Sequence, residues 1–253
     1  MATIDERTAW EILRIYSTEC SQIDPDSLLA IYAIGSLPGG YYRHGQSDID
    51  AILIVSDGSE VIWGNSNTPS KKLADLNQRY KQKYGIPKDF NPFPLQPSEL
   101  RPPYDPDKEL TLEIARLKLQ GKLVYGTFSL NDIPMPARED FLKDFRHFEE
   151  YWENDFSINT LVERMTPTQC VNTILMHLHR YLIIEKGSFE FDKRKIVPSC
   201  TAYDAPFLNR PALDIVQKFL LSEHISQRET NSLRQYMSDL RYNMNKLLKI
   251  WNK

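Results

Sequence analysis

Two short apolar runs joined by a glycine-containing segment constrain the fold of this chain most. The runs are Leu28–Ile34 (LLAIYAI) and Ile49–Val55 (IDAILIV), and Gly35 follows the first of them directly. Apolar runs of this length, bounded by turn residues, are typical of buried strands. The sequence therefore predicts two buried strands with a turn between them.

Further helices and strands surround these runs along the first half of the chain. The capping-box pattern Thr3-x-x-Glu6 predicts a helix start, because the Thr hydroxyl and the Glu carboxylate satisfy free backbone N–H groups. Pro92 and Pro94 confine a later strand to a sheet edge, since proline donates no ladder hydrogen bond. The expected helices span residues 4–20, Thr68 to Gly85 and 109–120, and the expected strands span residues 90–96 and 122–125.

The composition changes near residue 130, where the segment LNDIPMPARED is typical of a linker. Helical signals dominate the remainder, and Thr166 with Gln169 and Ser226 with Glu229 form capping boxes. The expected helices span residues 137–156, 166–187, 211–222 (capped by Asn209) and 226–251. We therefore expect an α+β fold, with a mixed-sheet domain of residues 1–128, a helical-bundle domain of residues 136–253, and a cleft between them.

Composition and charge exclude several classes of protein. With 41% hydrophobic and 26% charged residues, the chain is ordinary globular protein rather than disordered or collagen-like. A balance of 31 basic against 34 acidic residues argues against a nucleic-acid-binding protein. No apolar run reaches the length of a membrane helix, and the acidic start carries no export signal. Cys20, Cys170 and Cys200 fit no disulfide or zinc spacing, so we interpret them as buried small hydrophobes in a cytoplasmic protein.

The chemistry of the chain is concentrated around the two predicted strands. Asp48 and Asp50 open the second strand two residues apart, so they point to the same face. Two adjacent carboxylates repel unless a cation lies between them, and Mg²⁺ is commonly held by one or two carboxylates plus phosphate oxygens. Gly35 permits close backbone approach, and the hydroxyls of Ser36 and Ser47 can donate to a phosphate. The alternative is a glycine-rich hairpin with incidental acids.

The order of these pieces resembles a known signature. An apolar strand, GS, eleven intervening residues and SDID resemble the motif of the DNA polymerase β-like nucleotidyltransferase superfamily. The stretches ELTLEIARLKLQGKLVYG and TILMHLHRYLIIEKG, the second followed by KRK, look like the streptomycin and spectinomycin type of aminoglycoside adenylyltransferase. The resemblance covers nearly the whole chain, and the GS…SDID segment is its specific part.

The resemblance assigns roles to the strand-end residues. It implies that Gly35 and Ser36 hold the nucleoside triphosphate, and that Asp48 and Asp50 hold Mg²⁺ and are catalytic. Members of this superfamily often need a third carboxylate, which acts as a base or completes the metal site. The nearest acid on the next predicted strand is Asp89, our candidate, although a direct overlay places Asn91 at that position. The fallback candidates are Glu99, Glu109 and Glu113.

The second half supplies weaker candidates. The resemblance implies that Lys193 or Lys195 in FDKRK and Tyr242 on the last helix contact the nucleotide phosphates. The alternatives are a solvated basic loop for the lysines and a core or surface role for the tyrosine. A polycationic acceptor favours acids beside an aromatic face. The acidic cluster from Glu149 to Asp155 therefore suggests acceptor contacts, and the alternative is a solvated helix face; the acceptor candidates are Trp152, Glu153 and Asp155.

The resemblance implies an Mg²⁺-dependent enzyme with ATP as co-substrate, which moves AMP to a hydroxyl of a small molecule, with an aminoglycoside as the leading acceptor. Two alternatives remain open. In the first, the acceptor is a protein or RNA, as in toxin–antitoxin nucleotidyltransferases. In the second, the chain binds nucleotide without catalysis. We expect no membrane partner, and the sequence decides neither monomer nor homodimer.

Overall fold

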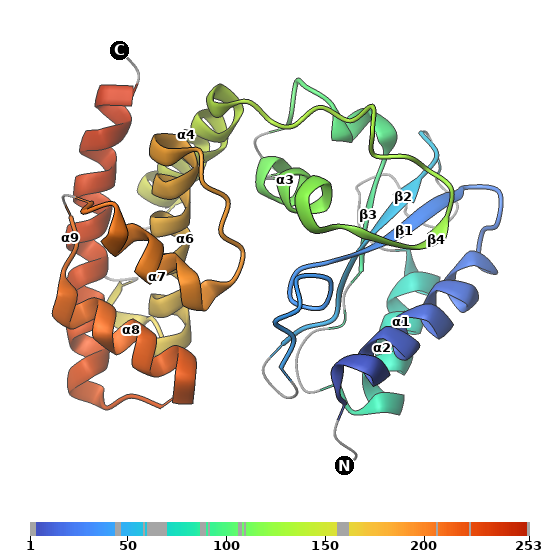
Figure 1. The fold of residues 1–253 in the computed structure, drawn as a ribbon, viewed down its shortest axis with the longest axis horizontal. Helices are drawn as coiled ribbons and strands as arrows, with labels where there is room; N and C mark the ends of the chain where they lie inside the picture. Colours follow the sequence, from blue (N-terminus) through green and yellow to red (C-terminus); the bar gives the residue numbers. More distant parts are fainter. Residues whose placement is uncertain are drawn as a thin grey trace. The chain divides into compact units, whose positions relative to one another are not determined.

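The computed structural model describes residues 4–43, 47–57, 59, 70–86, 90, 92–105, 108, 110–155, 162–205, 207–222 and 224–251, with backbone alone for residues 151–155 and 222. The chain divides into two compact units, Met1–Pro136 and Ala137–Lys253 (Figure 1). Each unit is described below by itself. The predicted domain limits, 1–128 and 136–253, stay predictions.

The first unit contains a four-stranded mixed sheet in the order β3-β2-β1-β4. The strands are β1 (Leu28–Ile34), β2 (Asp50–Val55), β3 (Phe93–Leu95) and β4 (Lys122–Gly126). β1 pairs antiparallel with β2 and with β4, whereas β2 pairs parallel with β3. The two predicted buried strands are therefore confirmed as the centre of the sheet. β3, which contains Pro94, lies at one edge as predicted.

Helices cover both faces of this sheet (Figure 1). α1 (Glu6–Ser21) and α2 (Lys71–Tyr84) pack on one face, while the 3-10 helix η1 (Pro97–Leu100) and α3 (Leu110–Gln120) pack on the other. Side chains alternate along β2. Ile49, Ala51, Leu53 and Val55 join the core under α1 and α2, and Ile52 and Ile54 join the core under α3. The continuous apolar pattern of the strands follows from this two-sided burial.

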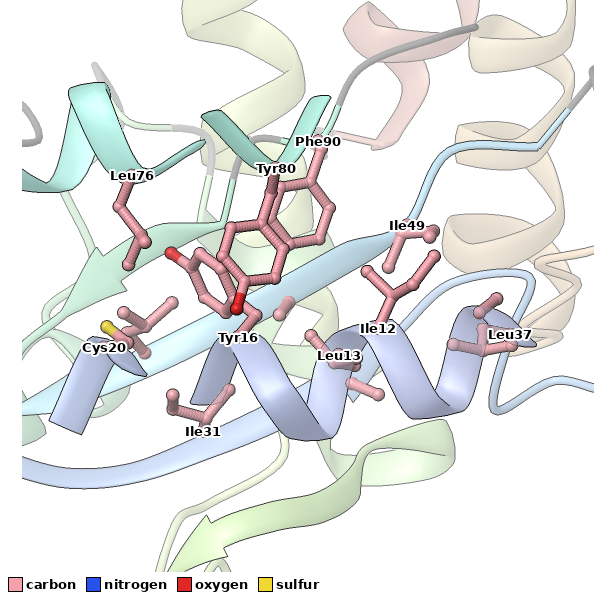
Figure 2. Packing of buried hydrophobic residues seen from close by; sticks show 14 of the residues in the cluster. Ile12, Leu13, Tyr16, Cys20, Ile31, Leu37, Ile49, Leu76, Tyr80 and Phe90 are labelled. Carbon is pink, nitrogen blue, oxygen red and sulfur yellow. The ribbon is translucent and has the colours of Figure 1, made fainter. Parts of the chain in front are cut away.

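An aromatic cluster fixes α1 and α2 against the sheet (Figure 2). The fully buried Tyr16 ring meets Tyr80 and Phe90 edge-on, with centroid separations of 5.3 and 4.8 Å. Its hydroxyl donates to Asn77 Oδ1 at 2.7 Å, so the buried phenol oxygen is satisfied. Burial raises the pKa of Tyr16 well above its ordinary value, which keeps the phenol neutral.

The second unit is helical in its described residues. Its helices are α4 (Arg138–Asp155), α6 (Pro167–Lys186), α7 (Lys193–Ala202), α8 (Arg210–Ser222) and α9 (Gln227–Trp251). Both predicted capping boxes are confirmed: Thr166 Oγ1 accepts from the Gln169 N–H at 3.3 Å, and Ser226 Oγ accepts from the Glu229 N–H at 3.2 Å. α9 contributes a row of buried apolar side chains to the core of this unit: Leu233, Tyr236, Met237, Leu240, Met244 and Leu248.

Three local predictions were wrong. The α1 N-cap is Asp5, whose carboxylate accepts the Thr8 N–H at 2.8 Å, and not Thr3. α2 begins after Ser70, and not at Thr68. The KRK segment opens helix α7, and Asp192 caps that helix. α7 was not among the expected helices, because Pro198 inside it masked the helical pattern.

Two expectations from composition can be compared with the described residues. Cys20, Cys170 and Cys200 are free and buried, as predicted. Burial raises the pKa of Cys20 and of Cys200 to about 12, which keeps both thiols protonated. Among the described helices, none combines the length and the apolar character that a membrane span requires.

Candidate active site

The candidate site begins where β1 ends in a tight turn. Gly35 follows Ile34 with a φ of 74°, in the left-handed region that favours glycine. The Gly39 N–H donates to the Gly35 carbonyl at 3.2 Å, and the Tyr41 N–H donates to the Ser36 carbonyl at 3.1 Å. The chain therefore folds back on itself within a few residues after the strand.

The register of the sheet brings an aspartate against this turn. Ile34, the last residue of β1, pairs with Asp50, the first residue of β2. A Cβ atom added to Gly35 would lie 2.7 Å from Asp50 Oδ2. The Asp50 carboxylate therefore occupies the space that a side chain at position 35 would need. The sequence spacing of the GS and DID motifs is thus converted into direct contact.

Asp48 and Asp50 open β2 on one side of the strand. Ile49 between them is fully buried in the core under α1 and α2. Because side chains alternate along an extended chain, its two neighbours point away from that core. Both aspartates are half-buried. This is the pairing that the sequence analysis expected.

The two serines near the carboxylates differ in their surroundings. Ser36 Oγ is buried and has no hydrogen-bond partner among the described residues. A buried hydroxyl without a partner is uncommon, so this oxygen is suited to meeting a ligand. Ser47 instead closes the next turn: its Oγ accepts the Arg43 N–H, and its N–H donates to the Arg43 carbonyl, both at 2.9 Å.

Tyr42 borders the acidic pair and was not among the candidate residues. The Arg43–Ser47 hydrogen bonds bring the chain on either side of that turn together, so Tyr42 and Asp48 approach each other. Burial raises the pKa of Tyr42, and the negative charges of Asp48 and Asp5 raise it further. The sequence signal for the approach of Tyr42 to Asp48 was the short spacing between Arg43 and Ser47.

Asp48 and Asp50 offer two carboxylate groups to a divalent cation. Within the described ranges, no group of three or more His, Cys, Asp or Glu side chains is placed to hold a metal. Mg²⁺ usually takes one or two carboxylates together with waters and substrate phosphates, so Asp48 and Asp50 suffice as protein ligands. Asp89 and Asn91, the candidates for a third position, lie outside the described residues.

The fallback acids of the first unit are engaged in local contacts. Glu99 accepts the Gln96 N–H at 2.7 Å and pairs with Lys108 Nζ at 2.6 Å, which assigns it a role in capping η1. Glu113 pairs with Arg116 at 2.9 Å on the same helix. Glu109 lies outside the described residues. These contacts make Glu99 and Glu113 poorer candidates for a base.

The nucleotide candidates of the second unit lie on two helices. Lys193 and Lys195 lie in the first turn of α7, and Lys193 Nζ donates to Asn172 Oδ1 at 3.2 Å. Tyr242 is 63% exposed on α9, and Lys246 Nζ lies 4.2 Å from its ring centroid. Their contacts with nucleotide stay predictions.

The acidic cluster on α4 is not one continuous surface. Trp152, Glu153 and Asp155 lie in its last residues, whose side chains are outside the described set. Glu149 is buried and pairs with Arg241 at 3.1 Å. The predicted grouping of Glu149 with a solvated or acceptor-binding face is therefore wrong, because its carboxylate is buried in the second unit and pairs with Arg241.

Comparison with solved structures shows that the fold is similar to that of a solved adenyltransferase. The chain is similar to the spectinomycin adenyltransferase AAD(9) from Enterococcus faecialis, whose structure contains ATP and spectinomycin. The identity is 16%, the TM-score is 0.61, and the match covers 93% of this chain and 99% of that one. A toxin–antitoxin structure with AMP-PNP also matches, at 15% identity and a TM-score of 0.27, over 59% of this chain and 95% of that one. The sequence matches no family model and no curated protein.

Proposed function

We propose that this protein is a nucleotidyltransferase that moves AMP from ATP to a hydroxyl group of a small molecule. The observation that carries the proposal is the contact between the Gly35 turn and the Asp50 carboxylate, with Asp48 beside it and the unpartnered Ser36 hydroxyl in the same turn. Phosphate-binding groups and metal-binding carboxylates are the two components that phosphoryl transfer needs in one place.

In the proposed reaction, the acceptor oxygen bonds to the α-phosphorus of ATP. The bond between the α-phosphorus and the oxygen that bridges to the β-phosphate breaks, and pyrophosphate leaves. The Ser36 hydroxyl donates a hydrogen bond to a phosphate oxygen, and Gly35 leaves room for that phosphate close to the backbone. Asp48 and Asp50 would hold Mg²⁺. When bound, this ion supplies positive charge that stabilises the negative charge developing on the phosphates.

The proposal assigns the acceptor's proton to Asp89. A hydroxyl is a poor nucleophile at neutral pH, and a positioned carboxylate typically contributes about 10²- to 10⁴-fold. Asp89→Ala is expected to abolish transfer while nucleotide binding persists, because the Asp48–Asp50 pair is untouched. Measuring transfer and ATP affinity on the same preparation separates the two effects.

Asn91 provides a second test, because the overlay places this residue at the position of the third carboxylate. If Asp89→Ala keeps normal turnover, the base assignment fails, and Asn91→Glu becomes the informative variant. A gain of transfer in Asn91→Glu would mean that the natural chain is a weak or inactive transferase. Without such a gain, attention moves to Glu109, or to Glu99 and Glu113 despite their ion pairs.

An aminoglycoside is the leading acceptor in this proposal. Two observations support it: the fold likeness to a spectinomycin adenyltransferase over 93% of the chain, and a net charge of −3 that suits a polycationic substrate. Lys193, Lys195 and Tyr242 are proposed to contact the nucleotide, and Trp152, Glu153 and Asp155 the acceptor. Incubation with labelled ATP, Mg²⁺ and a panel of aminoglycosides tests the assignment. Label on a protein or RNA, or binding of ATP without turnover, would favour the alternatives.

Substitution of the carboxylate pair tests the reaction itself. Asp48→Asn and Asp50→Asn each remove one charge while nearly preserving shape. Transfer is expected to fall at least about 100-fold, because several kcal/mol of charge stabilisation are lost. Asp132→Asn, an exposed aspartate of the same unit, is the matched control and should keep normal transfer. Near-normal turnover in either site variant, with unchanged melting temperature, would disprove the site.

A further inference from the structure

The two edge strands of the sheet in the first unit differ in how well they can pair with a further strand. β3 at one edge contains Pro94, which donates no hydrogen bond and so discourages pairing with another strand. β4 at the other edge (KLVYG) contains no proline, and three of its five residues are exposed. The backbone hydrogen bonds of β4 within the described residues are made toward β1. β4 is therefore the open edge of the sheet.

Exposed leucines accompany this open edge. Leu123 in β4 is 50% exposed, and Leu119 in the last turn of α3 is 54% exposed. A register shift in the β1–β4 pairing bends the strand. Strand pairing on the outer side of β4 is therefore confined to a short segment, and any partner must gain additional contacts from the neighbouring side chains.

Those neighbouring side chains belong to α1. An open groove of about 760 Å³ lies between α1 and the start of β4. Lys122 Nζ lies 5.8 Å from the centroid of the Trp10 ring, which fixes Trp10 at the level of the first residues of β4. We call this surface, made by Glu6, Trp10 and Arg14 of α1 with Lys122 and Leu123 of β4, the α1–β4 face.

One row of α1 on this face has a palindromic order of opposite charges, while Arg7 and Glu11, which also line the groove, pair with each other at 3.3 Å. Glu6, Trp10 and Arg14 are spaced by four residues, so they form one row along the helix. Glu6 and Arg14 are exposed, and Trp10 between them is partly buried. If a second α1 ran antiparallel across this row, Glu6 would meet Arg14 at each end and the two Trp10 rings would meet at the centre.

We propose that the α1–β4 face binds a second copy of this chain across a two-fold axis near Trp10 and Leu123. A two-fold interface places one patch against itself, so each charge must find its opposite within the same patch. The Glu6–Trp10–Arg14 row meets that requirement, whereas a different partner would not need a palindromic order. Antiparallel pairing of the two β4 edges joins the sheets and covers Leu123 of both copies.

Sedimentation equilibrium of the full chain tests the proposal. The natural protein is expected to dimerise at micromolar concentration. Arg14→Glu and Glu6→Arg are each expected to weaken the dimer at least about tenfold, because each places like charges together at both ends of the interface. The double variant, with both charges exchanged, is expected to regain dimerisation. A natural chain that stays monomeric to about 100 μM, or a double variant at least as weak as the singles, would overturn the proposal.

Two further variants locate the interface and exclude unfolding. Leu123→Lys should weaken the dimer, and Leu221→Lys, at a leucine on α8 that is 67% exposed, should leave it unchanged. Leu123→Cys should be captured as a covalent dimer by a short bis-maleimide, whereas Leu221→Cys should not, because the natural cysteines are buried. Melting temperatures equal to that of the natural chain establish that each variant is folded. Equal cross-linking at both positions would contradict the assigned face.

Discussion

At the residue scale, the candidate site depends on one position that lacks a side chain. Gly35 combines a left-handed backbone with contact to the Asp50 carboxylate, so it meets two separate requirements. Gly40 shares the first requirement alone: its φ is also 74°, but an added Cβ would have nothing within 4 Å. The pair therefore separates backbone strain from displacement of the aspartate.

This difference predicts divergent effects of the same substitution. Gly35→Ala and Gly40→Ala should each lower the free energy of unfolding by about 1–2 kcal/mol, since both force a Cβ into the left-handed region. Only Gly35→Ala should also lower transfer, by about 100-fold, because it pushes the Asp50 carboxylate from its place. Chemical denaturation and a transfer assay measure the two quantities. Equal losses of transfer in both variants would show that the turn conformation matters and the aspartate contact does not.

At the element scale, buried charges link three helices of the second unit. Glu149 of α4 accepts from Arg241 of α9 at 3.1 and 3.2 Å, and His177 of α6 lies 3.5 Å from the same carboxylate group. The guanidinium of Arg180 covers the ring of Phe148 at 4.2 Å. Burial lowers the pKa of His177 well below its ordinary value, and the charges of Arg180 and Arg241 lower it further, so the imidazole is neutral in the folded protein.

This neutral histidine predicts a pH dependence of stability. Below a pH of about 6.5 the unfolded chain binds a proton at His177 and the folded chain does not, so stability falls as the pH falls. The maximum slope is about 1.4 kcal/mol per pH unit. Between about pH 7.5 and 5.5, the melting temperature of His177→Leu should therefore decrease by less than that of the natural chain. His224→Gln, at an exposed histidine, is the control and should keep the natural slope. A natural slope in His177→Leu would mean that His177 titrates alike in both states.

Helices and strands with strong local sequence signals were predictable. Helix boundaries for which several nearby residues compete as caps, and a helix that forms despite an internal proline, were not. The β1 run and the Thr166 and Ser226 capping boxes depend on neighbouring residues alone, so their patterns sufficed. Helix starts at Asp5 and Ser70 required choosing between several nearby caps of similar strength. Helix α7 was hidden by Pro198, whose penalty the tertiary packing of Ile196, Val197 and Cys200 overcomes.

The site followed the same division. The approach of Gly35 to Asp50 was predictable because the sheet register brings these two residues together at a fixed sequence spacing. The approach of Tyr42 to Asp48 depends on the Arg43–Ser47 turn, which no strong turn motif announces. Burial of Glu149 depends on Arg241, 92 residues away, so local sequence assigned it wrongly to a surface cluster.

At the scale of the whole molecule, each unit buries its own core. In the second unit, Ile174, Leu182, Val216, Leu233 and Met244 are fully buried. The Glu149, His177 and Arg241 group also lies entirely within Ala137–Lys253. The size of this unit falls within the range of domains that fold alone. We therefore expect residues 137–253 to be an independent folding domain.

The isolated fragment of residues 137–253 tests this expectation with two readouts. It should show a helical circular dichroism spectrum and one cooperative thermal transition, because the contacts that bury its core are internal. As the pH falls below about 6.5, its melting temperature should decrease as that of the full chain does. His177→Leu should reduce this decrease in both, since Glu149, Arg180 and Arg241, the described partners of His177, lie within the fragment. A helical spectrum without a cooperative transition would show that the fragment keeps its helices but not their packing. In that case the second unit depends on the first for its fold, and the two-domain organisation would be wrong.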